Sequence, residues 1–186
     1  MNLKNYKYTS IPQPLKVVHE GTDIKKIWQL RQSEYGKYYP TMDAANDSYD
    51  DHSCILYTED ELGNFISTGR MVLDGELGLP ADAIIPSALK RLRKAYQTIA
   101  EPGRFAIAPE GRGLLPLYLK TYYKLALDLN INLLVFITRN KNMGFYQREF
   151  SAEIVEQDIG YNYGTDYQFA LLALEVSPHL PRFMRH

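Results

Sequence analysis

The feature that most constrains the fold of this 186-residue chain is a change of hydrophobic period between residues 101 and 137. Residues 105–108 form an apolar run of strand length, and residues 109–113 follow with the proline and glycines of a turn. Apolar side chains then recur three or four positions apart over residues 115–129, which predicts one buried face of a helix. The continuous apolar run at residues 131–137 is typical of a strand buried on both faces.

Strand, turn, helix and strand in this order predict a βαβ unit with a right-handed crossover and two parallel neighbouring strands. Pro116 fits the first turn of the helix, and Asn130 fits the left-handed residue that ends it. Backbone N–H groups at the start of such a helix attract anions, and Glu101 and Arg104 flank this place. The unit is therefore either a site for a phosphate or a developing oxyanion, or an ordinary core unit with a solvated turn.

The other expected elements are less distinctive than the βαβ unit. They are a short edge strand at 15–19, a helix capped by Thr22 that ends near Gly36, hairpin strands at 54–58 and 65–73, a basic helix at 89–98, a helix at 143–150, strands at 152–156 and 167–176, a turn at 161–165 and an irregular C-terminal tail. Gly69 and Arg70 interrupt the second hairpin strand, which indicates a bulge or a close approach to the backbone. We expect a single domain over residues 1–186, because this length fits one core and no clear boundary divides it.

Composition argues against several classes of protein. The formal net charge of -1 provides no global positive field, so we expect no nucleic-acid partner. The single cysteine, Cys54, precludes an internal disulfide and lies in a strand-like run, which favours a buried thiol over a nucleophile. No apolar run reaches the length of a membrane span and the N-terminus has no signal-peptide core, so we expect a cytoplasmic protein without a membrane span.

Three groups of charged residues are candidates for a functional site. Arg31 and Tyr35 lie on an otherwise apolar helix stripe, where the guanidinium either has a buried partner or extends to the surface. The acidic segment 37–53, with Asp47 and Asp50, is either a solvated loop or a flap over a cleft. It lacks the glycine and terminal glutamate of a calcium loop, so we predict no bound metal. The basic helix is either a solvated face or a docking face for an acidic partner.

Together these pieces resemble a GNAT-type acyltransferase. The residues that carry this resemblance follow the βαβ unit and are Asn142, Phe145, Tyr146 and Phe150. The resemblance implies an α/β (α+β) fold, namely a GNAT-like three-layer αβα arrangement with a central mixed, largely antiparallel sheet and a splayed parallel strand pair. A closer resemblance, over residues 22–150, is to the autoinducer (acyl-homoserine-lactone) synthases and the related long-chain N-acyl amino acid synthases. It is carried by Arg31, Tyr35, Asp47, Asp50, Arg70, Glu101, Arg104 and Phe105.

Two details bear on the substrates that this resemblance implies. Residues 112–116, Arg-Gly-Leu-Leu-Pro, do not complete the pyrophosphate loop of ordinary GNAT enzymes. The donor implied is therefore an acyl chain on acyl carrier protein, with acyl-coenzyme A as the other candidate and no permanently bound cofactor. The Asn and the Phe-Tyr pair resemble the N-acyl amino acid synthases more than the lactone synthases, so the implied acceptor is the amine of a small molecule such as an amino acid.

The implied reaction is aminolysis of an acyl thioester, with a medium or long acyl chain. Glu101 is the candidate base, unless an ion pair with Arg104 weakens it. Tyr146 is either the acid for the leaving thiolate or a packed core residue. Arg31, Arg70 and Arg104 either hold the acceptor carboxylate or pair with Asp47, Asp50 and Glu101, and we expect a structural network for most of them.

The remaining implied positions surround the βαβ unit. Backbone N–H groups of residues 105–108, which include Phe105, Ala106 and Ile107, are expected to hold the tetrahedral oxyanion. Arg112 and Gly113 lie at the turn, and Asn142 lies before the helix at 143–150. The residues expected to line an apolar slot between the parallel strands are Leu134, Phe136 and Phe145.

Two other functions fit the same residues. One is an ordinary acetyl-coenzyme A N-acetyltransferase, which would prefer acetyl over long acyl donors. The other is a catalytically silent module that binds acyl or pantetheine groups, in which the basic helix docks an acidic carrier protein without turnover.

Overall fold

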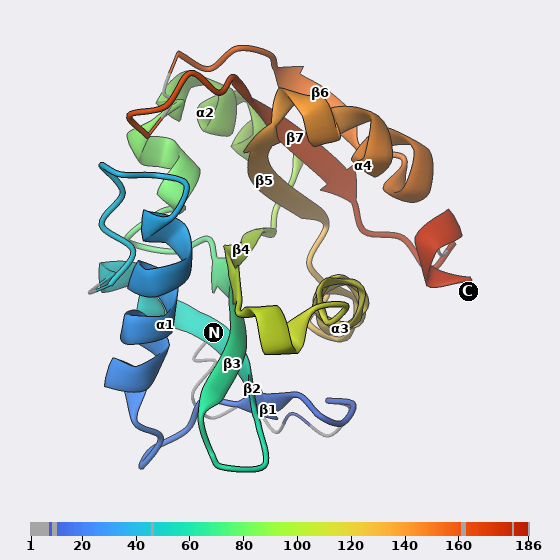
Figure 1. Ribbon diagram of the computed structural model, residues 1–186. Helices are drawn as coiled ribbons and strands as arrows, with labels where there is room; N and C mark the ends of the chain where they lie inside the picture. The colour runs from blue at the N-terminus through green and yellow to red at the C-terminus, as the bar shows by residue number, and fades with distance from the viewer. Residues whose placement is uncertain (1–7, 9–10, 46, 161–162, 180, 186) are drawn as a thin grey trace. The chain divides into compact units, whose positions relative to one another are not determined.

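The computed structural model describes residues 8, 11–45, 47–160, 163–179 and 181–185. Within these residues the strands form a mixed seven-stranded sheet in the order β1-β2-β3-β4-β5-β7-β6, accompanied by four α-helices (Figure 1). The strands are β1 Lys16–Val17, β2 Ser53–Glu59, β3 Phe65–Leu73, β4 Ile99–Ile107, β5 Leu133–Arg139, β6 Glu153–Glu156 and β7 Phe169–Glu175. The helices are α1 Ile24–Gly36, α2 Pro86–Ala95, α3 Leu115–Asp128 and α4 Met143–Phe150. The pair β4–β5 is parallel and the pairs β1–β2, β2–β3, β5–β7 and β6–β7 are antiparallel, which confirms the predicted mixed, largely antiparallel sheet.

The chain groups into two compact units that alternate along the sequence. The residues of unit 1 are 1–72, 103–121 and 163–165. The residues of unit 2 are 73–102, 122–162 and 166–186. The chain passes from one unit to the other inside β4 and inside α3, and the single domain expected over residues 1–186 stays a prediction.

Helix α1 is held in unit 1 by its apolar face. Ile27 is fully buried and packs with Ile55 and Tyr57 of β2. The helix begins after Asp23, whose carboxylate accepts a hydrogen bond from the backbone N–H two residues further on, at 3.2 Å. The predicted cap Thr22 is therefore wrong by one residue, because its hydroxyl accepts from a backbone N–H of the preceding turn.

Strands β2 and β3 form the predicted hairpin, and Gly63 takes φ +77° in the turn between them. Gly69 pairs in regular register with Leu56, and the register with β2 shifts only further along, between Thr58 and Glu59. A Cβ atom at Gly69 would lie 2.8 Å from the ring of Phe105, so only a glycine lets that ring lie against β3. The predicted bulge at Gly69 is therefore wrong, and the alternative of a close approach is confirmed.

Strand β4 begins at Ile99 rather than at residue 105. Ile99 and Ala100 pair in parallel with Leu133 and Leu134 of β5, so the strand continues through the residues that the sequence pattern left outside it. The parallel register covers these two positions only, whereas β5 pairs with β7 along its whole length. This short pairing is what a splayed parallel pair requires.

Helix α2 ends at Ala95 rather than at residue 98, because Thr98 already belongs to the approach to β4. The Thr98 hydroxyl donates to the carbonyl oxygen of Asn130 at 2.8 Å. Asn130 has φ +54° and ends α3 in the predicted left-handed conformation. Because the chain is still leaving the helix at Asn130, β5 starts at Leu133 rather than at residue 131.

The C-terminal third contains the predicted helix α4 and the predicted central strand β7, which is buried over all residues except its last. Phe183, in a short 3-10 turn at Arg182–Met184, packs on Phe150 of α4 with ring centroids 4.7 Å apart. The described part of the tail is therefore docked rather than irregular. Of the predicted turn at 161–165, residues 161 and 162 lie outside the described residues. None of the helices in the described ranges is long and apolar enough to cross a membrane.

Candidate active site

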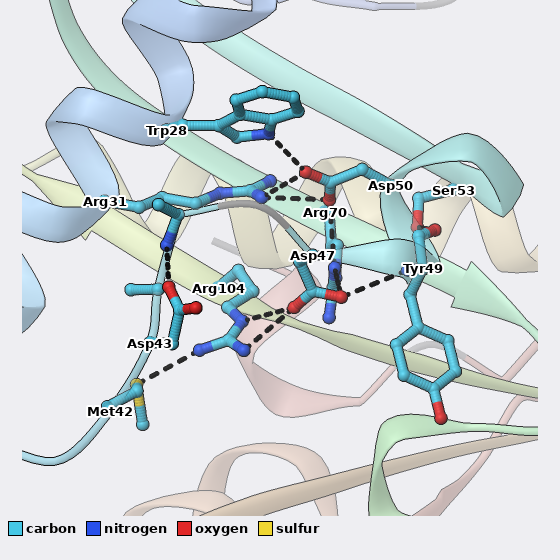
Figure 2. Close-up of polar contacts among 12 residues, drawn as sticks. Trp28, Arg31, Met42, Asp43, Asp47, Tyr49, Asp50, Ser53, Arg70 and Arg104 are labelled. Carbon is cyan, nitrogen blue, oxygen red and sulfur yellow. Dashed lines mark hydrogen bonds and ion pairs between the residues drawn. The ribbon is translucent and has the colours of Figure 1, made fainter.

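Three arginines and two aspartates form a buried network in unit 1 (Figure 2). Arg31 Nη1 lies 2.9 and 2.6 Å from the two carboxylate oxygens of Asp50. Arg70 Nη1 lies 2.8 Å from Asp47 Oδ1 and 2.9 Å from Asp50 Oδ1. Arg104 donates from Nε and Nη2 to Asp47 Oδ2 at 3.0 and 2.8 Å. The predicted structural network between the arginines and the acidic segment is confirmed by these contacts.

A short 3-10 helix, Ser48–His52, brings both aspartates to the network. Asp47 caps this helix by accepting a hydrogen bond from the N–H of Tyr49 at 3.1 Å. Asp50 also accepts a hydrogen bond from the indole of Trp28 at 3.0 Å. The side chains of Asp47 and Asp50 are only 8% and 7% exposed, so a solvated loop is the wrong description of these residues. The role of the segment as a flap stays a prediction.

Arg31 is fully buried, so the alternative in which its guanidinium extends to the surface is wrong. Its Nε and Nη2 atoms are buried and have no hydrogen-bond partner among the described residues. These two donors share one edge of the planar guanidinium, whereas Nη1 faces Asp50. Burial lowers the pKa of Arg31, and the charges of Arg70 and Arg104 contribute in the same direction, while Asp50 opposes them. This edge has the geometry that pairs with a carboxylate.

The charges of the network do not cancel. Burial alone would raise the pKa of Asp47, but the hydrogen bond and charge of Arg70 and the charge of Arg104 outweigh it and hold the pKa at about 2. Burial alone would lower the pKa of Arg70, but Asp47 and Asp50 outweigh it and raise that pKa. The network therefore contains three guanidinium groups and two carboxylates, a formal excess of one positive charge.

Arg104 adopts a backbone conformation that is unusual for its residue type, with φ +53° inside β4. Its guanidinium binds Asp47, contacts the sulfur of Met42 at 3.1 Å and lies 5.9 Å from the ring centroid of Tyr35. Burial raises the pKa of the Tyr35 hydroxyl, so this ring stays neutral beside the arginine. Residues held in strained backbone regions cluster at functional sites, and the Arg104 side chain is part of the network.

The candidate base Glu101 is half-buried in the first part of β4, in unit 2. Its Oε2 atom accepts a hydrogen bond from the backbone N–H of Ala81 at 2.9 Å. Ala81 belongs to the 3-10 turn Pro80–Ala83. Whether Glu101 acts as the base stays a prediction.

The expected oxyanion donors lie at the end of β4, and one of them is not available. The N–H of Ala108 donates to the carbonyl oxygen of Ile66 at 2.9 Å, so including residue 108 in the donor set was wrong. Phe105, Ala106 and Ile107 keep this role as a prediction. Arg112 and Gly113 are exposed at the turn before α3, where Gly113 has φ +93°.

The residues around α4 form an aromatic cluster in unit 2. The ring centroid of Tyr146 lies 4.8 Å from that of Phe136, 5.1 Å from that of Phe145 and 6.1 Å from that of Phe150. Burial raises the pKa of Tyr146, and a hydrogen bond with Thr138 partly offsets this shift. These contacts fit the packing alternative for Tyr146 and keep its hydroxyl protonated, so a role as acid stays a prediction.

Asn142, at the start of α4, is tied back to the preceding strand. Its Nδ2 atom donates to the hydroxyl of Thr138 at 3.5 Å. Leu134, two positions before the half-buried Phe136 on β5, is buried. Phe145 is 36% exposed, which leaves part of the aromatic cluster open to solvent.

Sequence analysis missed three residues that hold these side chains. Trp28 lies three positions before Arg31 on the same helix stripe, and this spacing was the available signal for its contact with Asp50. Met42 and Ala81 gave no signal, because their contributions are a sulfur contact and a backbone N–H. Cys54 is confirmed as buried, and burial raises the pKa of its thiol to about 12, which rules out a ready nucleophile.

The fold of this protein is the GNAT-type acyltransferase fold. More particularly, the family model of the N-acyl amino acid synthase FeeM matches residues 26–175, and the chain belongs to this family. No curated protein sequence gives a match.

Solved structures with a similar fold include an N-acyl amino acid synthase, acyl-homoserine lactone synthases and putative N-acetyltransferases. FeeM, an N-acyl amino acid synthase from uncultured soil microbes, has a TM-score of 0.67 and 17% sequence identity, over 87% of this chain and 90% of that one. BjaI, a coenzyme A-dependent acyl-homoserine lactone synthase, has a TM-score of 0.61 and 12% identity, over 87% and 78%. LasI, an AHL synthase, has a TM-score of 0.60 and 16% identity, over 88% and 90%. At these identities the structures establish the fold.

Proposed function

We propose that this acyltransferase moves a medium or long acyl chain from a thioester to the amino group of an amino acid. The acyl donor is a chain on acyl carrier protein or on coenzyme A. Membership of the N-acyl amino acid synthase family supports the reaction class. The choice of an amino acid as the acceptor rests on one observation, the buried edge of the Arg31 guanidinium.

This edge presents two N–H donors, from Nε and Nη2, that have no partner among the described residues. Each buried donor without a partner costs about 1–3 kcal/mol. The two donors are parallel and match the two oxygens of a carboxylate, which every free amino acid has. The excess positive charge of the network further favours an anion there. Because Arg31 is fully covered, binding requires the covering residues to move, and the segment 37–53 is the proposed flap.

The chemistry that we assign is a direct aminolysis. Glu101 takes a proton from the acceptor ammonium, and the neutral nitrogen then attacks the thioester carbonyl carbon. The C–N bond forms, and backbone N–H groups of Phe105, Ala106 and Ile107 stabilise the oxyanion. The C–S bond then breaks, and the thiolate receives a proton from Tyr146, whose raised pKa keeps it protonated before this step. The attacking nitrogen loses its second proton to the tyrosinate as it becomes the amide, and Glu101 releases its proton to solvent.

The acceptor proposal is tested on the substrate rather than on a variant that could fail to fold. Thiol release from octanoyl and palmitoyl thioesters is measured with amino acids and with the corresponding amino acid amides. We expect the acids to be preferred by about a hundredfold in kcat/KM, since the amides lack the charge that Arg31 binds. Equal use of acids and amides would refute carboxylate recognition. Preference for acetyl-coenzyme A would instead identify an ordinary N-acetyltransferase, and donor binding without release would identify a binding module.

The base is tested by Glu101→Gln. We expect kcat to fall by about a hundredfold or more, with the same unfolding midpoint, because the amide cannot accept the proton. Wild-type turnover in this variant would remove Glu101 from the role of base.

A further inference from the structure

The turn that holds Glu101 is itself fixed by an ion-pair clamp that lies wholly within unit 2. Arg93, in the last turn of α2, donates from Nε and Nη2 to the two oxygens of Asp74 at 2.7 and 2.8 Å. It also donates from Nη1 and Nη2 to the two oxygens of Asp82 at 2.6 and 2.5 Å. One guanidinium thus binds two carboxylates with both oxygens of each, the geometry in which arginine pairs are strongest.

Each carboxylate of the clamp is tied to an element near Glu101. The backbone N–H of Asp74 donates to the carbonyl oxygen of Ile99 at 3.0 Å, two residues before Glu101 on β4. Asp82 belongs to the turn Pro80–Ala83, and its Oδ2 atom accepts from the N–H of Leu79 at 2.8 Å. The clamp therefore joins the turn to the strand that carries the candidate base.

The turn offers a backbone N–H donor to Glu101. Pro80 has no N–H, so the N–H of Ala81 is the first donor of the turn, and it binds Glu101 Oε2 at 2.9 Å. Gly78 precedes the turn with φ +68°, and a Cβ atom there would lie 2.7 Å from Asp82 Oδ2. A side chain at position 78 would push on the clamp directly, so the glycine is required by the close approach of the Asp82 carboxylate.

We propose that Arg93, with Asp74 and Asp82, is a positioning residue for Glu101: the clamp holds the turn whose Ala81 N–H orients the carboxylate that accepts the proton. This inference rests on the proposed function only for the role of Glu101. It assigns Arg93 a task inside the fold, distinct from the docking of a carrier protein that its basic helix suggested.

The structural part of the proposal is tested without any substrate, by hydrogen exchange at the Ala81 amide. We expect Arg93→Gln to speed this exchange by about tenfold, because the turn loses the two ion pairs that hold it. Gly78→Ala changes no charge and should have the same effect through its clash with Asp82. The matched control is Arg148→Gln, since Arg148 is a 60% exposed arginine of the same unit with Glu149 as its partner. Unchanged exchange in both Arg93→Gln and Gly78→Ala would overturn the proposal.

The functional part is tested by kinetics with octanoyl and palmitoyl thioesters and free amino acids. We expect Arg93→Gln to lower kcat by about ten- to a hundredfold with unchanged KM values, as a misplaced base would. The same change in a Glu101→Ala background should cause no further loss, because Arg93 acts through Glu101. An equal loss in both backgrounds would identify a general structural role and overturn the proposal.

The outcomes separate this inference from the proposed function. Inactive Glu101→Gln with wild-type kcat in Arg93→Gln would overturn the positioning role alone. Wild-type turnover in Glu101→Gln would overturn the base, and the positioning role with it. If Arg93→Gln fails to fold, Gly78→Ala and Asp82→Asn give the same two measurements, and their agreement with wild type would overturn the proposal.

Discussion

At Asp47 a single carboxylate is shared by two guanidinium groups, and this governs how the protein responds to acid. The pKa of Asp47 in the folded protein, about 2, lies below the ordinary value of 3.8. Its contribution to the free energy of unfolding is therefore complete above about pH 4 and is lost as the pH falls from 3.8 through 2. We expect this loss to be about 2 kcal/mol. In Asp47→Asn this part of the acid dependence should disappear, as measured by urea unfolding across pH 2–6. Asp128→Asn, at an exposed aspartate of α3, is the control, and a variant at position 47 that keeps the wild-type pH dependence would contradict the assignment.

A second prediction concerns Asp50, the ion-pair partner of the buried Arg31. Asp50→Asn removes the charge that faces Arg31, which is fully buried, and leaves its guanidinium without a compensating anion. Breaking a buried pair in this way costs about 3–5 kcal/mol. We expect a corresponding loss in the free energy of unfolding, measured by urea titration at pH 7. A loss below about 1 kcal/mol would mean that the pair behaves like a surface ion pair.

On the scale of an element, β3 depends on the absence of a side chain at Gly69. The Cβ atom of Gly69→Ala would lie 2.8 Å from the Phe105 ring and 3.1 Å from the Tyr118 ring, so one of these rings must move. We expect destabilisation by about 1–3 kcal/mol, as in other overpacked cores. The matched control is Gly36→Ala at the end of α1, where a Cβ atom meets nothing within 4 Å and helix propensity favours alanine. Equal stability of the two variants in urea titrations would contradict the close approach at position 69.

The elements that sequence analysis found are those with local causes. The period of three to four residues defines α3, and Asn130 ends it because a short polar side chain tolerates the left-handed conformation. The start of β4 was missed because Ile99 pairs with Leu133, which is distant in sequence. Gly69 remained ambiguous for the same reason, since its neighbour Phe105 comes from another strand.

The same distinction between local and distant causes applies to the residues of the site. An arginine on an apolar helix stripe needs a partner if it is buried, so the pairing of Arg31 with the acidic segment could be predicted from the sequence. The contact between Glu101 and Ala81 could not be predicted in this way, because Ala81 contributes a backbone N–H, which every residue except proline has. Contacts between side chains can be predicted from residue types, whereas contacts with backbone donors can be identified only from the folded structure.

On the scale of the whole molecule, the proposed recognition of an acidic carrier protein would depend on local charges. The formal net charge of -1 cannot steer an anion, so the proposed docking depends on the basic residues of α2. Two of these are already engaged: Arg91 pairs with Glu156 at 3.4 Å and Arg93 forms the clamp. Lys90 and Lys94 are exposed, so the predicted docking face is reduced to these two lysines.

If Lys90 and Lys94 form the docking face, changing them should affect acyl carrier protein thioesters but not coenzyme A thioesters. Reversing both charges, with Lys90→Glu and Lys94→Glu, should lower kcat/KM for an acyl carrier protein thioester by about tenfold and weaken its dependence on salt, because docking loses its attractive charges. The coenzyme A thioester of the same acyl chain is the internal control, since it meets the same catalytic groups without a protein surface. Steady-state thiol release at several salt concentrations measures both donors. If the double variant uses them with wild-type efficiency and the same salt dependence, α2 is not the face that a carrier protein contacts.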